Sequence, residues 1–248
     1  MDLKDRTVIV TGGASGIGRA TALLLGRKGA NIIIGDIDEK GGRSAAAEGA
    51  AAGSAVEFVR LDLLSPSSID GFVAAVHTAV GRVDGLVNAA GWDRVQPFLD
   101  NPPETWERVI GINLMGAIRL TRGVLPPMAA ARTGKIVNIS SDAGRVGSTG
   151  ETVYAAAKGG LIAFTKSLAR EMARYGINVN CVCPGPTDTP LFQRQPERIK
   201  EALTRAIPFR RIAQPIEIAQ AVLFFISDRA NYITGQVLSV SGGLTMAG

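Results

Sequence analysis

The 248-residue chain is 46% hydrophobic and 20% charged, so it can bury a large core and is not intrinsically disordered. Its formal net charge is +5. No long basic run and no basic strip interleaved with aromatic residues accompanies that charge, which argues against a nucleic-acid-binding protein. The length suits a single α/β domain over residues 1–248.

Cysteine usage and hydropathy limit the setting in which the chain works. Cys181 and Cys183 alternate on a predicted strand and face one side, so we expect no disulfide framework. The chain has one histidine, and we expect no metal site. No apolar run approaches the ~18 residues of a membrane span, and the polar start is unlike a signal peptide. We therefore expect a cytoplasmic protein with no membrane partner.

Strands and helices alternate along the chain, which predicts a Rossmann-type doubly wound parallel sheet of about seven strands with helices on both faces. Ligands of such sheets bind beyond the carboxyl ends of the strands. Strands are predicted at 7–10, 31–34, 56–61, 84–88, 135–140, 178–182 and 236–240, and helices at 16–28, 38–49, 66–80, 104–131, 151–175 and 215–226. The residues at five of the strand ends are Asp36, Asp62, Asn88, Ser141 and Pro184.

The first strand runs into a glycine-rich turn, TGGASGIGR, at residues 11–19. Glycines at 12, 16 and 18 allow a tight turn and close approach of the backbone to a pyrophosphate, and the helix that follows offers free N–H groups. Asp36 ends the second strand about 20 residues further on, where a carboxylate binds a ribose 2′-hydroxyl and repels a 2′-phosphate. This pattern predicts NAD as the cofactor, while Arg19 and Arg43 keep NADP open.

Tyr154 and Lys158 are four residues apart on a predicted helix, so they share one face. A free tyrosine has a pKa of about 10, and a neighbouring ammonium group is expected to lower it. Ser141, thirteen residues before Tyr154, ends a predicted strand and can hold a carbonyl or alcohol oxygen. The three side chains therefore predict proton transfer to or from a substrate oxygen.

Together these motifs resemble those of the short-chain dehydrogenases/reductases, over nearly the whole chain from about residue 5. The resemblance rests on the T-G-x3-G-x-G pattern at 11–18, the spacing of Ser141, Tyr154 and Lys158, the segment NAAG at 88–91, Asn113, and Pro184-Gly185. It implies hydride transfer between a nicotinamide cofactor and a secondary alcohol or ketone. The implied cofactor-binding residues are Gly12, Ser15, Gly16, Ile17, Gly18, Asp36, Asp62, Asn88, Gly91, Pro184, Gly185, Thr187 and Thr189.

The resemblance also implies a role for each catalytic residue. Tyr154 gives or takes the proton, Lys158 lowers its pKa and contacts the nicotinamide ribose, and Ser141 positions the substrate oxygen. Asn113 holds a water that links Lys158 to solvent. Two residues have structural alternatives. Asn113 could be a buried polar group at a helix kink, and Asp62, expected at the adenine, could cap a helix.

Residues 186–214 interrupt the alternation with four prolines, a fifth at Pro215 just after them, and one short helical stretch near 197–206. Because this segment follows a strand end at the expected site, it is interpreted as a substrate lid. The other reading is a tolerated surface loop. Residues 1–100 then form mainly the dinucleotide-binding half, and 101–248 the catalytic half. The expected substrate-contacting residues are Trp92, Asp142, Arg145, Leu191 and Phe192, and the pocket lining also includes Asp93.

The lid carries a surplus of three positive charges between residues 188 and 212, which favours an anionic substrate such as a CoA thioester. The pairs Glu197–Glu201 and Lys200–Thr204, four residues apart, are not ion pairs and leave those charges free. The resemblance implies a cyclic 2-hydroxyacyl-CoA substrate. The alternatives are a free cyclic or aryl secondary alcohol and a 3-oxoacyl-carrier-protein. Arg194, Arg198 and Arg205 are expected to bind the CoA.

A homotetramer is implied by the resemblance. Its contacts would come from the helices at 104–131 and 151–175 and from the last strand. The apolar residues Ala155, Ala156, Ala157, Leu161, Ile162 and Phe164 are expected to form part of that interface.

Overall fold

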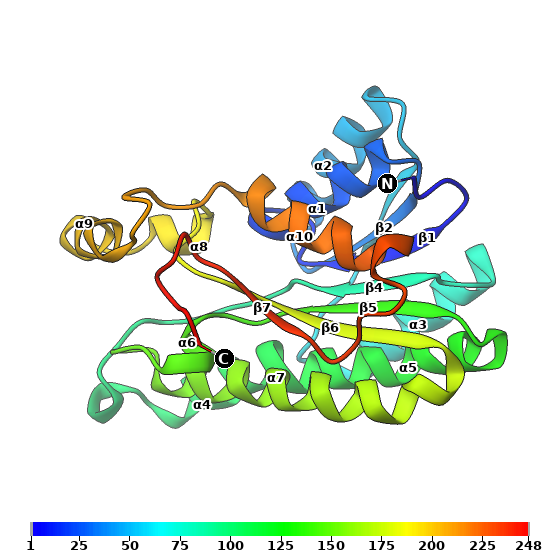
Figure 1. Ribbon diagram of the computed structural model, residues 1–248. Helices are drawn as coiled ribbons and strands as arrows, with labels where there is room; N and C mark the ends of the chain where they lie inside the picture. Colours follow the sequence, from blue (N-terminus) through cyan, green and yellow to red (C-terminus); the bar gives the residue numbers. More distant parts are fainter. Residues whose placement is uncertain (1, 248) are drawn as a thin grey trace.

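The computed structural model describes residues 2–247, within which seven strands form one fully parallel sheet (Figure 1). The strand order is β3-β2-β1-β4-β5-β6-β7, so the order reverses between β1 and β4. Ligands of doubly wound sheets bind at that reversal. The predicted fold class is therefore confirmed. The strands are β1 Thr7–Thr11, β2 Asn31–Asp36, β3 Val56–Arg60, β4 Gly85–Asn88, β5 Gly134–Ile139, β6 Ile177–Pro184 and β7 Val237–Val240.

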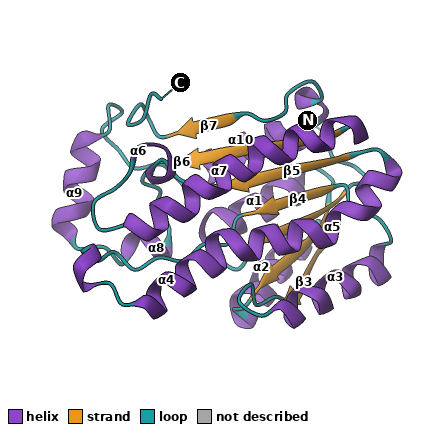
Figure 2. Cartoon of the chain, turned by 90° about the horizontal axis from the view of Figure 1, so that it is seen from below, coloured by secondary structure: helices purple, strands orange, loops and turns teal. Residues whose placement is uncertain are grey.

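Helices cover both faces of the sheet (Figures 1 and 2). One face carries α1 Gly16–Arg27, α2 Glu39–Ala51 and α10 Pro215–Ile226. The other carries α3 Pro66–Val80, α4 Pro103–Ile110, α5 Ala117–Ala131 and α7 Thr152–Met172. The short helices α6 Ala143–Val146 and α8 Pro190–Gln193, and the longer α9 Glu197–Ala206, lie beyond the carboxyl ends of the strands.

The central strand shows why these β-branched runs form strands buried on both faces. Val8, Ile9 and Val10 are all 0% exposed. Val8 and Val10 pack into the apolar cluster under α1 and α10, whereas Ile9 packs into the cluster under α3 and α5. Alternate side chains of a strand point to opposite faces, so a continuous apolar run suits a sheet covered on both sides.

The predicted helix at 104–131 is interrupted at Asn113, where the sequence analysis gave a helix kink as the structural alternative. Its first part, α4, ends at Ile110, a π-helical turn spans Gly111–Gly116, and α5 begins at Ala117. Within the turn, the carboxamide of Asn113 donates a 2.9 Å hydrogen bond to the Val109 carbonyl oxygen. Side-chain insertion into the helical hydrogen-bond pattern is a known cause of such a break, and π turns occur often at functional sites.

The two ends of the 186–214 segment are joined to each other. The Asp188 N–H donates to the Ala213 carbonyl at 2.8 Å, and the Ala213 N–H donates to the Pro186 carbonyl at 3.0 Å. The 24 or so residues between these bonds therefore leave and re-enter the domain at one place. The predicted helical stretch at 197–206 is confirmed as α9.

The glycine-rich turn tolerates no side chain at Gly18, because a Cβ there would lie 2.2 Å from the Gly12 carbonyl oxygen. We expect Gly18→Ala to destabilise the fold by about 3 kcal/mol or more, since backbone on both sides must shift. Thermal and urea unfolding would measure this. Gly71→Ala is the matched control: Gly71 lies in the exposed face of α3 with open space around it. Gly71→Ala should raise the free energy of unfolding by about 0.5–1 kcal/mol. Equal effects of the two changes would contradict the packing argument.

Candidate active site

The glycine-rich turn and Asp36 form a cradle at the reversal of strand order. A Cβ on Gly12, whose φ is +69°, would lie 2.7 Å from the Ala90 Cα, so the turn packs directly on the chain leaving β4. The Asp36 carboxylate accepts hydrogen bonds from the N–H groups of Ala14 and Asp38, both at 3.0 Å. The Asp36 carboxylate is thus held beside a turn whose glycines leave the backbone without side chains. This arrangement fits a dinucleotide.

The two arginines that kept NADP open are both paired with carboxylates. Arg19 forms an ion pair with Glu48. Arg43 lies 3.6 Å from a Glu39 oxygen and 5.7 Å from the centre of the Phe58 ring. Neither charge is therefore free to attract a 2′-phosphate without first leaving its partner.

The remaining predicted residues of the turn lie at the start of α1. Ser15 is the N-cap residue of α1, and its hydroxyl makes no capping hydrogen bond. Ile17 packs against the core under α1. A Cβ on Gly16 would lie 3.2 Å from a Thr189 methyl group, so the start of the segment 186–214 packs on this turn.

Ser141, Tyr154 and Lys158 come together at the carboxyl end of β5. Lys158 is 3% exposed, and its Nζ donates a 2.9 Å hydrogen bond to the Ile139 carbonyl oxygen. The same Nζ lies 5.6 Å from the centre of the Tyr154 ring. The side chain of Ser141 is near enough to the phenol to favour its ionised form. The predicted geometry of the three residues is therefore present.

The expected lowering of the Tyr154 pKa is not found in this structure. Burial raises the pKa of Tyr154 well above its ordinary value, and the nearby carboxylates of Glu151 and Asp93 add to the effect. Burial also lowers the pKa of Lys158 to about 8. Desolvation destabilises the charged form of each group, the phenolate of Tyr154 and the ammonium of Lys158. The attraction between the two charges does not compensate for it. The sequence analysis weighed the charge and omitted the burial.

In this structure the side chain of Asn113 forms hydrogen bonds with backbone groups. Its carboxamide nitrogen donates to the carbonyl oxygens of Trp92 and Val109, at 2.6 and 2.9 Å, and its oxygen accepts from the Trp92 N–H at 3.3 Å. These contacts match the kink-stabilising alternative. Gly91 lies between the side chains of Asn113 and Lys158. A Cβ on Gly91 would be 3.1 Å from the Asn113 oxygen and 3.6 Å from the Lys158 nitrogen.

Four predicted cofactor-binding residues use their side chains within the fold. The Asn88 amide nitrogen donates to Thr121 and Asn138 inside the core. The Asp62 carboxylate accepts from the Leu64 N–H in the turn before α3, whereas Ser65 caps that helix, so Asp62 is not the helix cap considered as its alternative. The Thr187 hydroxyl donates to the Gly185 carbonyl, and the Thr189 hydroxyl caps α8 by accepting from the Phe192 N–H. Pro184 ends β6, where Gly185 packs against Ser241.

The predicted substrate-contacting residues are only partly placed for that role. The Trp92 ring stacks under Arg108, with the guanidinium carbon 4.4 Å from the ring centre. Asp142 accepts a 2.6 Å hydrogen bond from the Ser239 hydroxyl, and Arg145 donates to Ser239 and to the Ala247 carbonyl. Asp142 and Arg145 thus hold the C-terminal segment.

The two lid residues differ in exposure. Leu191 is 36% exposed and Phe192 is 7% exposed, so Phe192 packs inside the lid. Leu191 is the better placed of the two for contact with a substrate.

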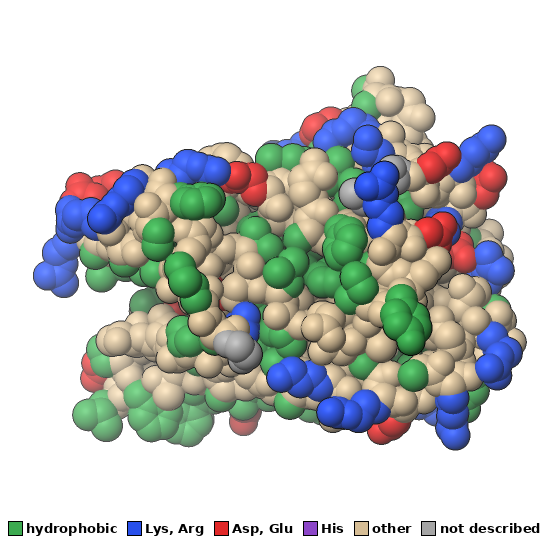
Figure 3. All heavy atoms as spheres, in the orientation of Figure 1, with side chains coloured by type: hydrophobic (Ala, Val, Ile, Leu, Met, Phe, Trp, Pro, Cys, Tyr) green, Lys and Arg blue, Asp and Glu red, His purple; other side chains and the backbone are tan. Residues whose placement is uncertain are grey.

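Helix α9 contains two ion pairs that the sequence analysis missed. Lys200 lies 2.7 Å from Glu197, a spacing of three that was not considered. Arg205 lies 3.6 Å from Glu201, a spacing of four that was overlooked beside the pairs Glu197–Glu201 and Lys200–Thr204. Arg211 is paired with Glu217 beyond the lid. Within residues 2–247, Arg194 and Arg198 have no carboxylate partner within 4 Å. Figure 3 shows cations gathered over α9, above a cleft that separates the lid from the chain near α6.

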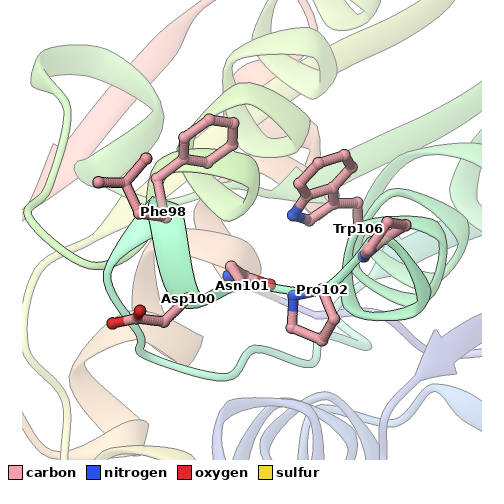
Figure 4. Close-up of a pocket in the computed structure, with 7 residues that line it drawn as sticks. Phe98, Asp100, Asn101, Pro102 and Trp106 are labelled. Carbon is pink, nitrogen blue, oxygen red and sulfur yellow. The ribbon is translucent and has the colours of Figure 1, made fainter.

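A second hollow lies outside the catalytic residues. It measures about 450 Å³ and is lined by residues 98–103 and Trp106 (Figure 4). The Phe98 and Trp106 rings, both in its lining, stack on each other with their centres 5.6 Å apart. Over residues 2–247 no group of three or more metal-ligating side chains occurs, and no helix has the length and hydropathy to cross a membrane.

Asp93 and Glu151 are carboxyl groups beside Tyr154 that were not among the predicted catalytic or substrate-contacting residues. Asp93 was expected only in the pocket lining, and Glu151 was not singled out. Burial, followed by the charge of Glu151, raises the pKa of Asp93 to about 7. The sequence held one signal for Glu151, since it precedes Tyr154 by three residues and shares its helical face.

We expect the buried Lys158 ammonium group to lower the free energy of unfolding, since its pKa in the folded state, about 8, lies below the ordinary 10.5. A lowered lysine pKa destabilises the fold fully below pH 8, and the cost fades as pH rises toward 10.5. We expect Lys158→Met to stabilise the protein by about 2 kcal/mol at pH 7, with a smaller gain at pH 10, measured by urea unfolding. Lys166→Met, exposed on the same helix, should show little change. A gain that grows with pH would contradict this reading.

The sequence was compared with known proteins. A family profile described as "Enoyl-(Acyl carrier protein) reductase" matches residues 12–245. The chain is 40% identical to the 3-oxoacyl-[acyl-carrier-protein] reductase FabG of Thermotoga maritima, over 99% of this chain and 100% of that protein. It is 37% identical to the (2S)-[(R)-hydroxy(phenyl)methyl]succinyl-CoA dehydrogenase subunit BbsD of Thauera aromatica, over 99% of each.

A cyclopentanol dehydrogenase of Comamonas testosteroni is 39% identical over 98% of each chain. Among solved structures, levodione reductase superposes with a TM-score of 0.93 at 32% identity, covering 97% of this chain and 98% of that one. These relatives match this chain almost end to end, and the levodione reductase structure shares its fold. The chain belongs to the short-chain dehydrogenase/reductase family.

Proposed function

We propose that this protein is an NAD-dependent oxidoreductase that interconverts a cyclic secondary alcohol and its ketone. The observation that carries the proposal is the convergence of Ser141, Tyr154 and Lys158 beside the glycine-rich turn and Asp36. One half of the site handles a proton and the other holds a dinucleotide. Membership of the oxidoreductase family supports the general reaction.

The proton half of the reaction falls to Tyr154. During reduction its phenol gives a proton to the carbonyl oxygen, and during oxidation it takes the hydroxyl proton back. The Ser141 hydroxyl holds the same substrate oxygen. Lys158 lies close to the phenol and is buried, so its ammonium stabilises the phenolate left after proton transfer. The side chain of Asn113 keeps Trp92, at the edge of the pocket, in place.

The hydride half requires a nicotinamide cofactor, which supplies or accepts the hydride when bound. Gly12, Ser15, Gly16, Ile17 and Gly18 would hold its phosphates, and Asp36 its adenosine ribose. Asp62 would lie at the adenine, and Pro184 and Gly185 below the nicotinamide. The carboxylate at Asp36 and the ion pairs of Arg19 and Arg43 favour NAD, because each opposes a 2′-phosphate.

Two observations bear on the substrate. A cyclopentanol dehydrogenase is among the relatives, which supports a cyclic alcohol. The second candidate is a cyclic 2-hydroxyacyl-CoA. It is favoured by Arg194 and Arg198, which are exposed on the lid without carboxylate partners among residues 2–247, and by the likeness to BbsD. The ion pairs of Lys200 and Arg205 reduce the free charge that was expected to bind CoA.

The substrate is tested by NADH formation at alkaline pH with cyclopentanol, cyclohexanol, 1-phenylethanol, 3-hydroxybutyryl-CoA and 2-hydroxycyclohexanecarboxyl-CoA, each with NAD and NADP. We expect turnover of at least one cyclic alcohol with NAD, and a loss of about 10²–10⁴-fold in Tyr154→Phe, because general acid–base catalysis contributes that much. Absence of turnover with every alcohol and both cofactors would refute the proposal.

Lid variants in the same assay separate the two substrate candidates. If the CoA ester is the substrate, Arg194→Ala and Arg198→Ala should raise its KM and leave that of cyclopentanol unchanged. Arg229→Ala, an exposed arginine outside the lid, is the matched control. Equal KM changes for both substrates would remove the role of the lid charges.

Cofactor choice is tested at Asp36. In Asp36→Ser the carboxylate that binds a ribose and repels a phosphate is lost, so the ratio of kcat/KM for NAD to that for NADP should fall about 10- to 100-fold, equivalent to about 1.4–3 kcal/mol. Initial rates with both cofactors measure it. Asp38→Ser, whose carboxylate caps α2 two residues away, is the control. A wild-type preference for NADP would overturn the assignment.

A further inference from the structure

The Ser141 hydroxyl belongs to a tight turn, so its position follows that of the backbone around it. The hydroxyl accepts a 3.1 Å hydrogen bond from the Ala143 N–H, two residues further on. One side of the turn packs on α7, because a Cβ on Gly144 would lie 2.7 Å from the carbonyl carbon of Lys158. A movement of this turn relative to α7 would therefore move Ser141 relative to Tyr154 and Lys158.

Asp142, the next residue, attaches the other side of the turn to β6 and β7. Its N–H donates a 3.0 Å hydrogen bond to the Pro184 carbonyl oxygen, and its Oδ1 accepts a 2.6 Å hydrogen bond from the Ser239 hydroxyl. Asp142 is 5% exposed, and its Oδ2 is buried with no hydrogen-bond partner within residues 2–247. The Ser239 hydroxyl is therefore the group that holds this buried carboxylate in place.

Arg145 joins the same hydroxyl to the end of the chain. Its guanidinium donates a 2.8 Å hydrogen bond to Ser239 Oγ and another to the Ala247 carbonyl oxygen. The Ser239 hydroxyl thus accepts from a cation and donates to an anion, and hydrogen bonds to ionised groups are the stronger kind. One hydroxyl of β7 therefore links α6, the turn that carries Ser141 and the C-terminal segment.

The C-terminal segment, residues 241–247, is itself anchored, so it can support this link. The Phe209 N–H donates a 3.2 Å hydrogen bond to the Gly242 carbonyl oxygen, and the Thr245 N–H donates to the Ser241 hydroxyl at 3.2 Å. Figure 1 shows the segment ending beside α6. The turn is therefore held between α7 on one side and β7 with this segment on the other.

We propose that Asp142 and Ser239 are positioning residues that act through Ser141, fixing the turn that carries it to β7. This inference rests on the proposed function, in which the Ser141 hydroxyl holds the substrate oxygen. Without the Ser239 hydroxyl, both oxygens of a buried carboxylate lack a hydrogen bond, which is costly. The carboxylate must then turn towards water and take the backbone of the turn with it. Ser141 loses its alignment with Tyr154, so the effect falls on turnover and not on cofactor binding.

The first test is a double-mutant cycle on the reduction of a cyclic ketone. We expect Ser239→Ala to lower kcat about tenfold or more, because a misplacement of about 1 Å can cost about 100-fold. In protein that already carries Ser141→Ala, the same change should cost less than about twofold, since no Ser141 hydroxyl remains to be displaced. The KM for the cofactor should stay the same in both backgrounds. Slow variants are followed as single turnovers at high enzyme concentration.

Two further variants are the controls of this cycle. Ser239→Thr keeps a hydroxyl at the same place and should restore the rate. Ser167→Ala removes an exposed hydroxyl from α7 and should behave like wild type. Equal losses from Ser239→Ala with and without the Ser141 hydroxyl would reduce the network to a general structural role and contradict the inference. An unchanged kcat in Ser239→Ala would contradict it as well.

The second test is hydrogen–deuterium exchange, which needs no turnover. In Ser239→Ala we expect faster exchange in residues 141–147 as well as in 241–247, because the bridge between them is lost, whereas β5 should exchange as in wild type. Faster exchange in 241–247 alone, or in neither segment, would overturn the inference. Asp142→Ala removes the same link from its other end, so it should give the same pattern and keeps the test available if Ser239→Ala does not fold.

The two tests separate this inference from the function on which it rests. If neither wild type nor any variant reduces a ketone, the proposed function fails. The exchange measurements then still decide whether the Ser239 bridge fixes the turn. If wild type is active and exchange in 141–147 does not respond to Ser239→Ala, the function stands and the positioning role of Asp142 and Ser239 fails.

Discussion

The site depends on the burial of one ammonium group. Lys158 is almost without solvent, and the Ile139 carbonyl is its one hydrogen-bond acceptor within residues 2–247. Removing a charge from water is costly, and burial lowers the pKa of Lys158 to about 8 for that reason. The Ile139 carbonyl that accepts its hydrogen bond ends β5, whose side chains pack into the apolar clusters on both faces of the sheet. The position of the ammonium group therefore depends on the packing of the core.

Much of this arrangement could be predicted from the sequence. The β-branched runs predict strands, the glycines predict the turn, and the alternation predicts a parallel sheet; each signal is local, and the strand order follows from few allowed connections. The spacing of Tyr154 and Lys158 likewise fixes their shared face. Such predictions succeed because helix and strand periods do not depend on tertiary context.

Other features could not be predicted, since they depend on distant contacts. A kink at Asn113 could be considered from the sequence, but its hydrogen bonds to the Trp92 backbone, 21 residues away, could not. The Tyr154 phenol resists ionisation because burial and two carboxylates outweigh one cation. The expected tetramer interface shows the same limit: Ala157 and Leu161 are buried inside the protomer and cannot contact a partner. An apolar helix face does not by itself distinguish the core from an interface.

Residues 186–214 leave and re-enter the domain at one place, where hydrogen bonds join Asp188, Ala213 and Pro186. Since those bonds close the loop at its base, a change of length beyond them adds little entropy cost, about 0.6 kcal/mol for each doubling. The segment beyond these bonds is therefore nearly independent of the scaffold that carries Ser141, Tyr154 and Lys158. Such a division allows this segment to change in length while the sheet and the arrangement of those three residues stay intact.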